Sequence, residues 1–152
     1  MKATDLLKKQ HKEVKALFKK IENTESARER RRLMNEIATN LEAHTVIEEE
    51  MFYPAVRGLE TQKAEEMVLE AYEEHHVVKL VLAELPNVDP EDERFHAKMT
   101  VLSELVLHHA DEEEKEMFKL AQKLGKDELE GLAEQMEERF EAARAKGGRA
   151  AA

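Results

Sequence analysis

Two histidine–glutamate pairs are the residues of this chain whose types and spacing most directly predict metal chemistry. His44 and Glu48 stand four positions apart, and so do His109 and Glu113. Residues four apart share one face of an α-helix, so each pair can present an imidazole and a carboxylate to the same cation. This mixture of nitrogen and oxygen donors suits iron, manganese or zinc. The two pairs therefore predict a metal site built on helices.

Each pair is preceded by a single histidine at almost the same distance. His11 lies 33 residues before His44, and His75 lies 34 residues before His109. The 152-residue chain thus reads as a duplicated helical hairpin, with one histidine and then a His-x-x-x-Glu in each copy. One hairpin cannot bury its apolar stripe alone, whereas two can bury each other's.

The elements that must position these residues are all predicted to be helical. Apolar residues recur at intervals of three or four, and no segment is typical of a strand. Helices are expected from Thr4 or Asp5 to a turn at 23–25, from a Ser26 capping box to Gly58 with a weak point at Pro54, from Thr61 to Leu85, and from Asp89 to near Gly125. We therefore expect an all-α protein: an antiparallel up-down four-helix bundle over residues 1–124, a short fifth helix over 126–145, and a flexible tail over 146–152.

The histidine–glutamate residues fall within the apolar register of their helices, so the carboxylates should point inward. An unpaired ionised carboxylate in a protein interior costs several kcal/mol or more, and a pair of divalent cations would compensate for it. A structural histidine or a surface salt bridge is the ordinary explanation for one such pair. The repeated arrangement of six inward residues favours the metal site.

Helix rise tests whether these ligands meet at one level. His44 and His75 both lie about 20 Å from the turn that joins their helices. For the first hairpin the match is poorer, at about 20 Å for His11 against about 27 Å for His44. The first connection must therefore climb along the bundle, or the second helix must start late.

Other polar residues near the proposed ligands have less specific roles. Tyr72, one turn before His75, is either a donor to the site or an ordinary core tyrosine. The acids that either orient imidazole rings or belong to the solvated face are Glu49, Glu74 and Glu112. The remaining histidines, expected to be solvated or to lie just outside the ligand set, are His76, His96 and His108.

The six-residue pattern, with Glu-Glu-Glu-Met-Phe-Tyr-Pro after His44, resembles the hemerythrin-like HHE cation-binding domain over nearly all of residues 1–124. The resemblance implies two iron ions in a diiron centre with an oxo or hydroxo bridge. It implies that Glu48 and Glu113 bridge the irons and that the histidines are terminal ligands. Hemerythrins carry two histidines four apart on the third helix, whereas Ala71 and Lys79 flank His75 here. The resemblance therefore does not extend to reversible oxygen carriage.

Three functions follow from this reading. The first is a diiron protein that binds or reacts with oxygen, nitric oxide or peroxide for sensing, scavenging or storage. The second is an enzyme, either a diiron catalase or peroxidase or an iron-handling oxidase. A ferritin-like oxidase is disfavoured, because the two Glu-x-x-His pairs it needs, Glu73 with His76 and Glu93 with His96, cannot lie at one level. The third is a metal-free helical interaction module.

Composition excludes other classes. The net charge of −10 argues against nucleic acid or an anionic membrane as the main partner, and the absence of cysteine excludes disulfides and thiolate metal sites. No apolar run is long enough to span a bilayer, and no leader-like segment opens the chain, so a cytoplasmic protein is expected. The fifth helix is expected to cover the bundle or to pair with another copy in a homo-oligomer.

Overall fold

The computed structural model describes the backbone of residues 1–151 and the side chains of residues 1–147. Five helical rods make up this part of the chain, and it contains no strand. The rods are α1 (Ala3–Glu22); α2 (Ala27–Ile47), continued by the π-helical turn η1 (Glu48–Phe52) and α3 (Tyr53–Arg57); α4 (Gln62–Glu84), followed by the 3₁₀ turn η2 (Leu85–Asn87); α5 (Glu93–Glu112), continued by the π-helical turn η3 (Glu113–Met117), α6 (Phe118–Ala121) and the 3₁₀ turn η4 (Gln122–Leu124); and α7 (Lys126–Ala151).

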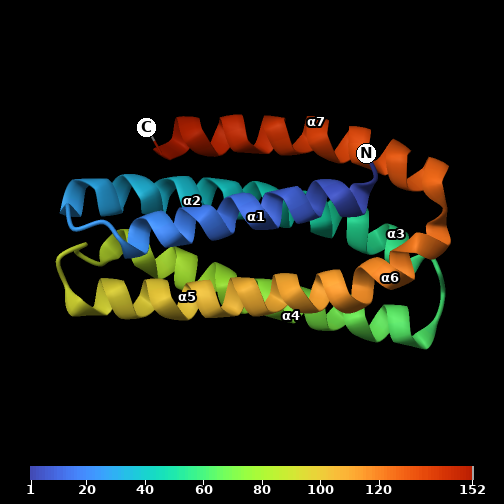
Figure 1. Ribbon diagram of the computed structural model, residues 1–152, viewed down its shortest axis with the longest axis horizontal. Helices are drawn as coiled ribbons and strands as arrows, with labels where there is room; N and C mark the ends of the chain where they lie inside the picture. The colour runs from blue at the N-terminus through green and yellow to red at the C-terminus, as the bar shows by residue number, and fades with distance from the viewer. Residues whose placement is uncertain (152) are drawn as a thin grey trace.

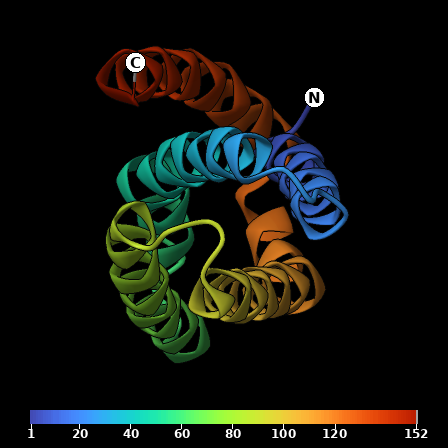
Figure 2. The same ribbon diagram turned by 90° about the vertical axis from the view of Figure 1, so that its left-hand side faces the viewer.

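The first four rods run up and down around a shared interior, and α7 lies outside them. Figure 1 shows the rods side by side, and the end view of Figure 2 shows α7 lying over the pair formed by α1 and α2, which it contacts. The predicted all-α fold, with a bundle and a further C-terminal helix, is confirmed. Within the described residues, no helix has the length and apolarity that crossing a membrane requires.

Polar side chains fix several helix starts. The hydroxyl of Ser26 accepts a hydrogen bond from the backbone N–H of Glu29, and that of Thr61 accepts one from Ala64, as their sequences predict. The predicted start of the fourth bundle helix at Asp89 is wrong by a few residues. Asp89 forms a turn, and Asp92 is the residue that caps α5.

Two π-helical turns interrupt the rods at equivalent points of the two halves. One begins at Glu48 and the other at Glu113, the two predicted carboxylate ligands. In each, the backbone N–H of the residue five positions on, Tyr53 or Phe118, donates to the carbonyl of that glutamate. Such turns are frequent at functional sites. The first also lets the rod continue through Pro54 instead of weakening there, because the proline enters just after the widened turn.

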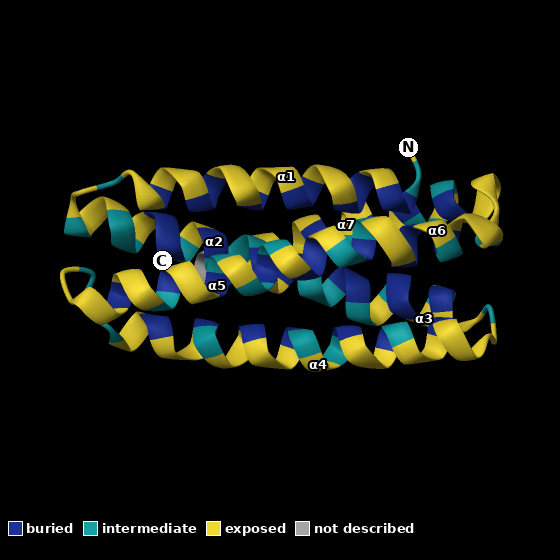
Figure 3. Cartoon of the chain, turned by 60° about the horizontal axis from the view of Figure 1, so that its bottom comes forward, coloured by how far each residue is buried: buried dark blue, intermediate teal, exposed yellow. Residues whose placement is uncertain are grey.

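The interior consists of two apolar clusters at opposite ends of the bundle. One is built around Leu7, Phe52 and Leu129, and the other around Ile37, Leu85 and Leu102. Figure 3 shows the alternation of buried and exposed faces along the rods that this packing requires. The histidines and glutamates lie between these clusters, so apolar packing on both sides holds their helices.

Helix α7 is longer than the sequence suggested. It has 26 residues and runs to Ala151, so the predicted end at residue 145 corresponds to no break in the helix. Alanines favour helix and carry it through the glycine pair at 147–148. Gly147 also allows α7 to approach α2 closely, because a Cβ there would lie 3.3 Å from Cγ2 of Thr39. Residue 152, the last of the predicted tail, lies outside the described residues.

The connection between α1 and α2 resolves the mismatch in level between His11 and His44. α1 ends 11 residues after His11, whereas α2 begins 17 residues before His44, a difference of about 9 Å along the axis. Figure 1 shows the connection running outward along the bundle from the end of α1 to the start of α2. Four extended residues can span about 13 Å, which is sufficient.

Candidate metal centre

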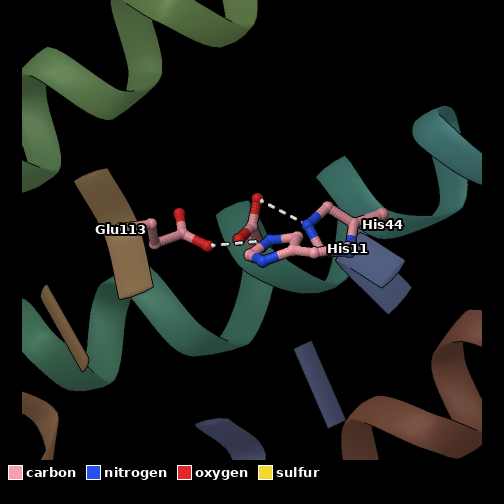
Figure 4. A group of neighbouring side chains, drawn as sticks. His11, His44 and Glu113 are labelled. Carbon is pink, nitrogen blue, oxygen red and sulfur yellow. Dashed lines mark ion pairs between the residues drawn. The ribbon is translucent and has the colours of Figure 1, made fainter. Parts of the chain in front are cut away.

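The six predicted donor residues converge in the middle of the bundle. His11 comes from α1, His44 and Glu48 from the second rod, His75 from α4, and His109 and Glu113 from the fourth rod. All six are buried. Figure 4 shows the side chains of His11, His44 and Glu113 pointing toward one another.

Distances within the cluster define two neighbouring groups of donors. One group contains His11, His44, Glu48 and Glu113, whose donor atoms all lie within 4.8 Å of one another. The other contains Glu48, His75 and His109 within the same limit. Glu113 also reaches both groups, since its Oε1 lies 3.4 Å from Nε2 of His11 and its Oε2 lies 3.2 Å from Nε2 of His109. Both carboxylates are therefore placed between the two pairs of histidines.

Four buried atoms of this cluster make no hydrogen bond within the described part of the chain. They are Nε2 of His11, Nε2 of His44, Oε2 of Glu48 and Oε1 of Glu113. Leaving a buried donor or acceptor unsatisfied costs about 1–3 kcal/mol, and more for a charged group. These four atoms belong to the four residues of the first donor group. A cation among them would satisfy all four, so the residues fit a metal.

The outward nitrogen of each imidazole is held by a polar side chain. Nδ1 of His75 lies 2.7 Å from Glu49, and Nδ1 of His109 lies 2.9 Å from Glu74, as the sequence analysis expected for these two acids. The other two partners were missed: Nδ1 of His11 lies 2.8 Å from Glu114, and Nδ1 of His44 lies 2.6 Å from Oε1 of Gln10. In the neutral tautomer that donates from Nδ1 to these acceptors, the Nε2 lone pair faces the centre, which is the arrangement of a metal-binding histidine.

Tyr53 is the central residue that the sequence analysis did not identify. Its ring is fully buried, and its hydroxyl donates to Oε2 of Glu113 at 2.6 Å and lies 3.1 Å from Oε1 of Glu48. The same oxygen is 3.1 Å from Nε2 of His75 and 3.2 Å from Nε2 of His109. The phenol therefore occupies the middle of the second donor group. The π-helical turn η1 places it there because its wider turn puts residue 53 closer to the helix face that carries Glu48.

Ionisation in the cluster follows burial and mutual attraction. Burial opposes the charge of Glu48, but the positive charge of His44 and hydrogen bonds from its neighbours outweigh it and hold the pKa of Glu48 well below its usual 4.5. Burial likewise disfavours protonated His109, but hydrogen bonds to Glu113 and Glu74 raise its pKa well above 6.5. The pKa values of His11 and His75 are also raised, because their carboxylate partners outweigh burial. In the metal-free protein, protons on the buried histidines therefore offset the negative charge of the carboxylates.

Burial and adjacent carboxylates act together on Tyr53. Both disfavour the phenolate, so the pKa of Tyr53 lies well above its usual 10.0. In the metal-free protein its hydroxyl is therefore a neutral hydrogen-bond donor at physiological pH.

The other residues that the sequence placed near the site lie outside the donor cluster. Tyr72 is not part of the donor cluster, because its hydroxyl donates to the backbone carbonyl of Glu49 at 3.2 Å while its ring packs against that of Tyr53. Glu112 orients no ligand and instead lies 3.2 Å from the exposed His108. His76 and His96 are exposed, so the two Glu-x-x-His pairs form no site.

The side chains that contact the four histidines from outside the donor cluster occupy equivalent sequence positions in the two halves, with two differences. Glu49 and Glu114 each follow a predicted carboxylate ligand by one residue, and Gln10 and Glu74 each precede a single histidine by one. The first difference is therefore a neutral amide on His44 where His109 has a carboxylate. The second is Phe118, stacked on His11, at the position equivalent to Tyr53. The two donor groups are thus chemically unequal.

Comparisons with known proteins agree with this site. The family described as the hemerythrin HHE cation binding domain matches residues 2–121. A crystal structure of a hemerythrin HHE cation binding domain-containing protein from Mycobacterium kansasii, a homolog of Rv2633c, superposes with a TM-score of 0.84 at 28% identity, covering 96% of this chain and 89% of that one.

Two curated sequences are also similar. The uncharacterized protein Rv2633c of Mycobacterium tuberculosis is 29% identical over 144 residues, covering 93% of this chain and 86% of that protein. A protein named DNA nickase from Nostoc is 26% identical over 118 residues, covering 78% of this chain, which spans only 33% of the nickase.

Proposed function

Because the chain belongs to the hemerythrin HHE cation-binding domain family, we propose that its buried cluster holds two iron ions and binds or reacts with a small molecule. The molecule is oxygen, nitric oxide or peroxide, and the role is sensing, scavenging or storage. The residues proposed as ligands are His11, His44, Glu48, His75, His109 and Glu113.

The four buried atoms without hydrogen bonds are the observation that carries the proposal. A polar core that served only to fix helix register would pair its members with one another, since half-satisfied buried networks destabilise a fold. Here Nε2 of His11 and Nε2 of His44 face carboxylate oxygens without satisfying them. This pattern favours a cation site over a metal-free interaction module.

The donor set leaves room for an external ligand. Four imidazole nitrogens and two shared carboxylates provide each of two cations with about four protein donors, fewer than the six of octahedral coordination. When bound, iron would supply Lewis-acid and redox chemistry toward a diatomic molecule or a peroxide. The chain itself fixes the imidazole rings through their Nδ1 partners. The Tyr53 hydroxyl lies among the donors of the second group, so a cation held there would displace it or take its oxygen as a further donor.

Iron is preferred to manganese or zinc on the basis of the family, and the mixed imidazole–carboxylate donors are compatible with it. No activity on DNA is proposed, because the matched region covers a third of the nickase and this chain carries a net charge of −10.

Elemental analysis combined with absorption spectra tests the proposal. Purified protein should retain iron, and its spectrum should change on addition of oxygen, nitric oxide or hydrogen peroxide. Steady evolution of oxygen from peroxide would favour the catalase alternative over binding. Colourless protein containing zinc and inert to all three reagents would refute both.

A further inference from the structure

A small cavity lies on the imidazole side of the cluster. It has a volume of about 40 Å³, and all four histidines of the centre line it. The rest of its lining is mainly apolar, chiefly Val14, Leu41, Val78 and Val106, and also includes the polar side chains of Gln10, Glu13, Asn40 and Thr45. One water-sized probe needs roughly 10–15 Å³ of such volume, so the cavity accommodates a molecule of about three heavy atoms. Apolar walls favour an uncharged one.

A second hollow lies outside the first, between α1 and α7. It has a volume of about 220 Å³, and charged side chains such as Lys9, Glu137 and Arg144 line it. Gln10, Glu13 and Phe140 line both hollows. The groove and the cavity therefore meet at these three side chains.

The three shared residues differ in what they contribute to this boundary. Gln10 is held in place by its 2.6 Å hydrogen bond with Nδ1 of His44. Glu13 is exposed and charged, at the solvent side. Phe140 is 6% exposed and is the residue of α7 that, among the described residues, lines the inner cavity. Its ring is the apolar side chain that the groove and the cavity share.

We propose that the groove between α1 and α7 is the access route to the centre and that Phe140 is its gate. The inference rests on the proposed function for the identity of the ligand that passes through the groove. That ligand is a small uncharged molecule or the neutral acid of a small anion. α7 then has a role beyond packing, since it places an aromatic ring over the imidazole side of the site. Displacement of that ring admits the ligand, and its size limits what enters.

Phe140→Ala tests the gate, and Met136→Ala is the matched control. Met136 lies one turn earlier on α7 and is fully buried, but it lines neither hollow. Two probes report access. Stopped-flow measures the association of azide with the iron-loaded protein, and ¹²⁹Xe exchange measures entry of xenon, which occupies apolar cavities, without any need for metal.

Phe140→Ala should raise both rates by about tenfold, which corresponds to a barrier lower by about 1.4 kcal/mol. Phe140→Leu, a milder change, should raise them less, and Met136→Ala should leave both unchanged. Equal acceleration by Met136→Ala, or no acceleration by either Phe140 variant, would overturn the gate. If xenon exchange responds to Phe140 while the protein binds no iron, the route stands and the proposed function fails. If iron binds but neither rate responds, the route fails and the function stands.

Discussion

Removal of a single hydroxyl, by Tyr53→Phe, tests how the cluster balances its buried charges. The hydroxyl donates to Oε2 of Glu113 at 2.6 Å, and it is the nearest uncharged donor to that carboxylate. A hydrogen bond to a charged group contributes about 1.5–3 kcal/mol to stability. In a domain of this size each kcal/mol shifts Tm by roughly 2–4 °C, so metal-free Tyr53→Phe should melt roughly 3–12 °C below the metal-free wild type.

Iron should reduce this difference, because a cation beside Glu113 offsets the carboxylate charge that the hydroxyl otherwise satisfies. Thermal unfolding followed by circular dichroism, with and without iron, measures both values. Tyr72→Phe is the matched control, since its hydroxyl donates to a backbone carbonyl at 3.2 Å and is only partly buried. That change should cost less than about 1.5 kcal/mol and should not depend on iron. The reasoning is refuted if Tyr53→Phe leaves Tm unchanged, or lowers it equally with and without iron.

Three further predictions concern the ligands, their outer partners and pH. His44→Ala should weaken iron binding by more than about 100-fold in chelator competition, since loss of an outer partner alone costs about 10–100-fold, while the exposed His108→Ala should retain iron. Glu74→Ala should weaken binding by about 10–100-fold, and equal weakening by Glu112→Ala would contradict the assigned hydrogen bonds. In urea titrations, stability of the metal-free protein should peak between about pH 4.5 and 6.5. It should fall on the acid side as Glu48 is protonated through its lowered pKa, and on the alkaline side as the buried histidines lose protons through their raised pKa values; a flat profile would show that these groups are unpaired.

The helices and the six candidate ligands could be predicted because they follow the ordinary α-helical period. His44 and Glu48 are four apart, and the repeat with His109 and Glu113 shows that the spacing is not accidental. Placement of these six residues together in the interior agrees with that prediction. Whether they bind metal stays a prediction.

Tyr53 could not be found by the same reasoning. Five residues along an α-helix correspond to a rotation of about 500°, which places Tyr53 about 140° away from Glu48. The π-helical turn winds more slowly and so reduces this offset. Nothing in the i, i+4 pattern indicates where such a turn occurs. Alignment of the two halves offers one hint, since an aromatic residue, Phe118, stands five positions after Glu113 as well.

The outer partners were predictable only in part because they depend on how adjacent helices are rotated. Glu49 and Glu74 were expected beside imidazoles and are found there, whereas Glu112 pairs with a surface histidine. Gln10 lies on a different rod from His44, the ring that it holds. Contacts of this kind become visible only when the rods are assembled.

Anomalous diffraction at the iron absorption edge, from crystals of the iron-loaded protein, tests the central claim most directly. The account predicts two peaks inside the bundle, one beside His11 and His44 and the other beside His75 and His109. Absence of peaks there, or a single peak at the outer group formed by the half-buried Glu74 with the exposed His108 and Glu112, would contradict it.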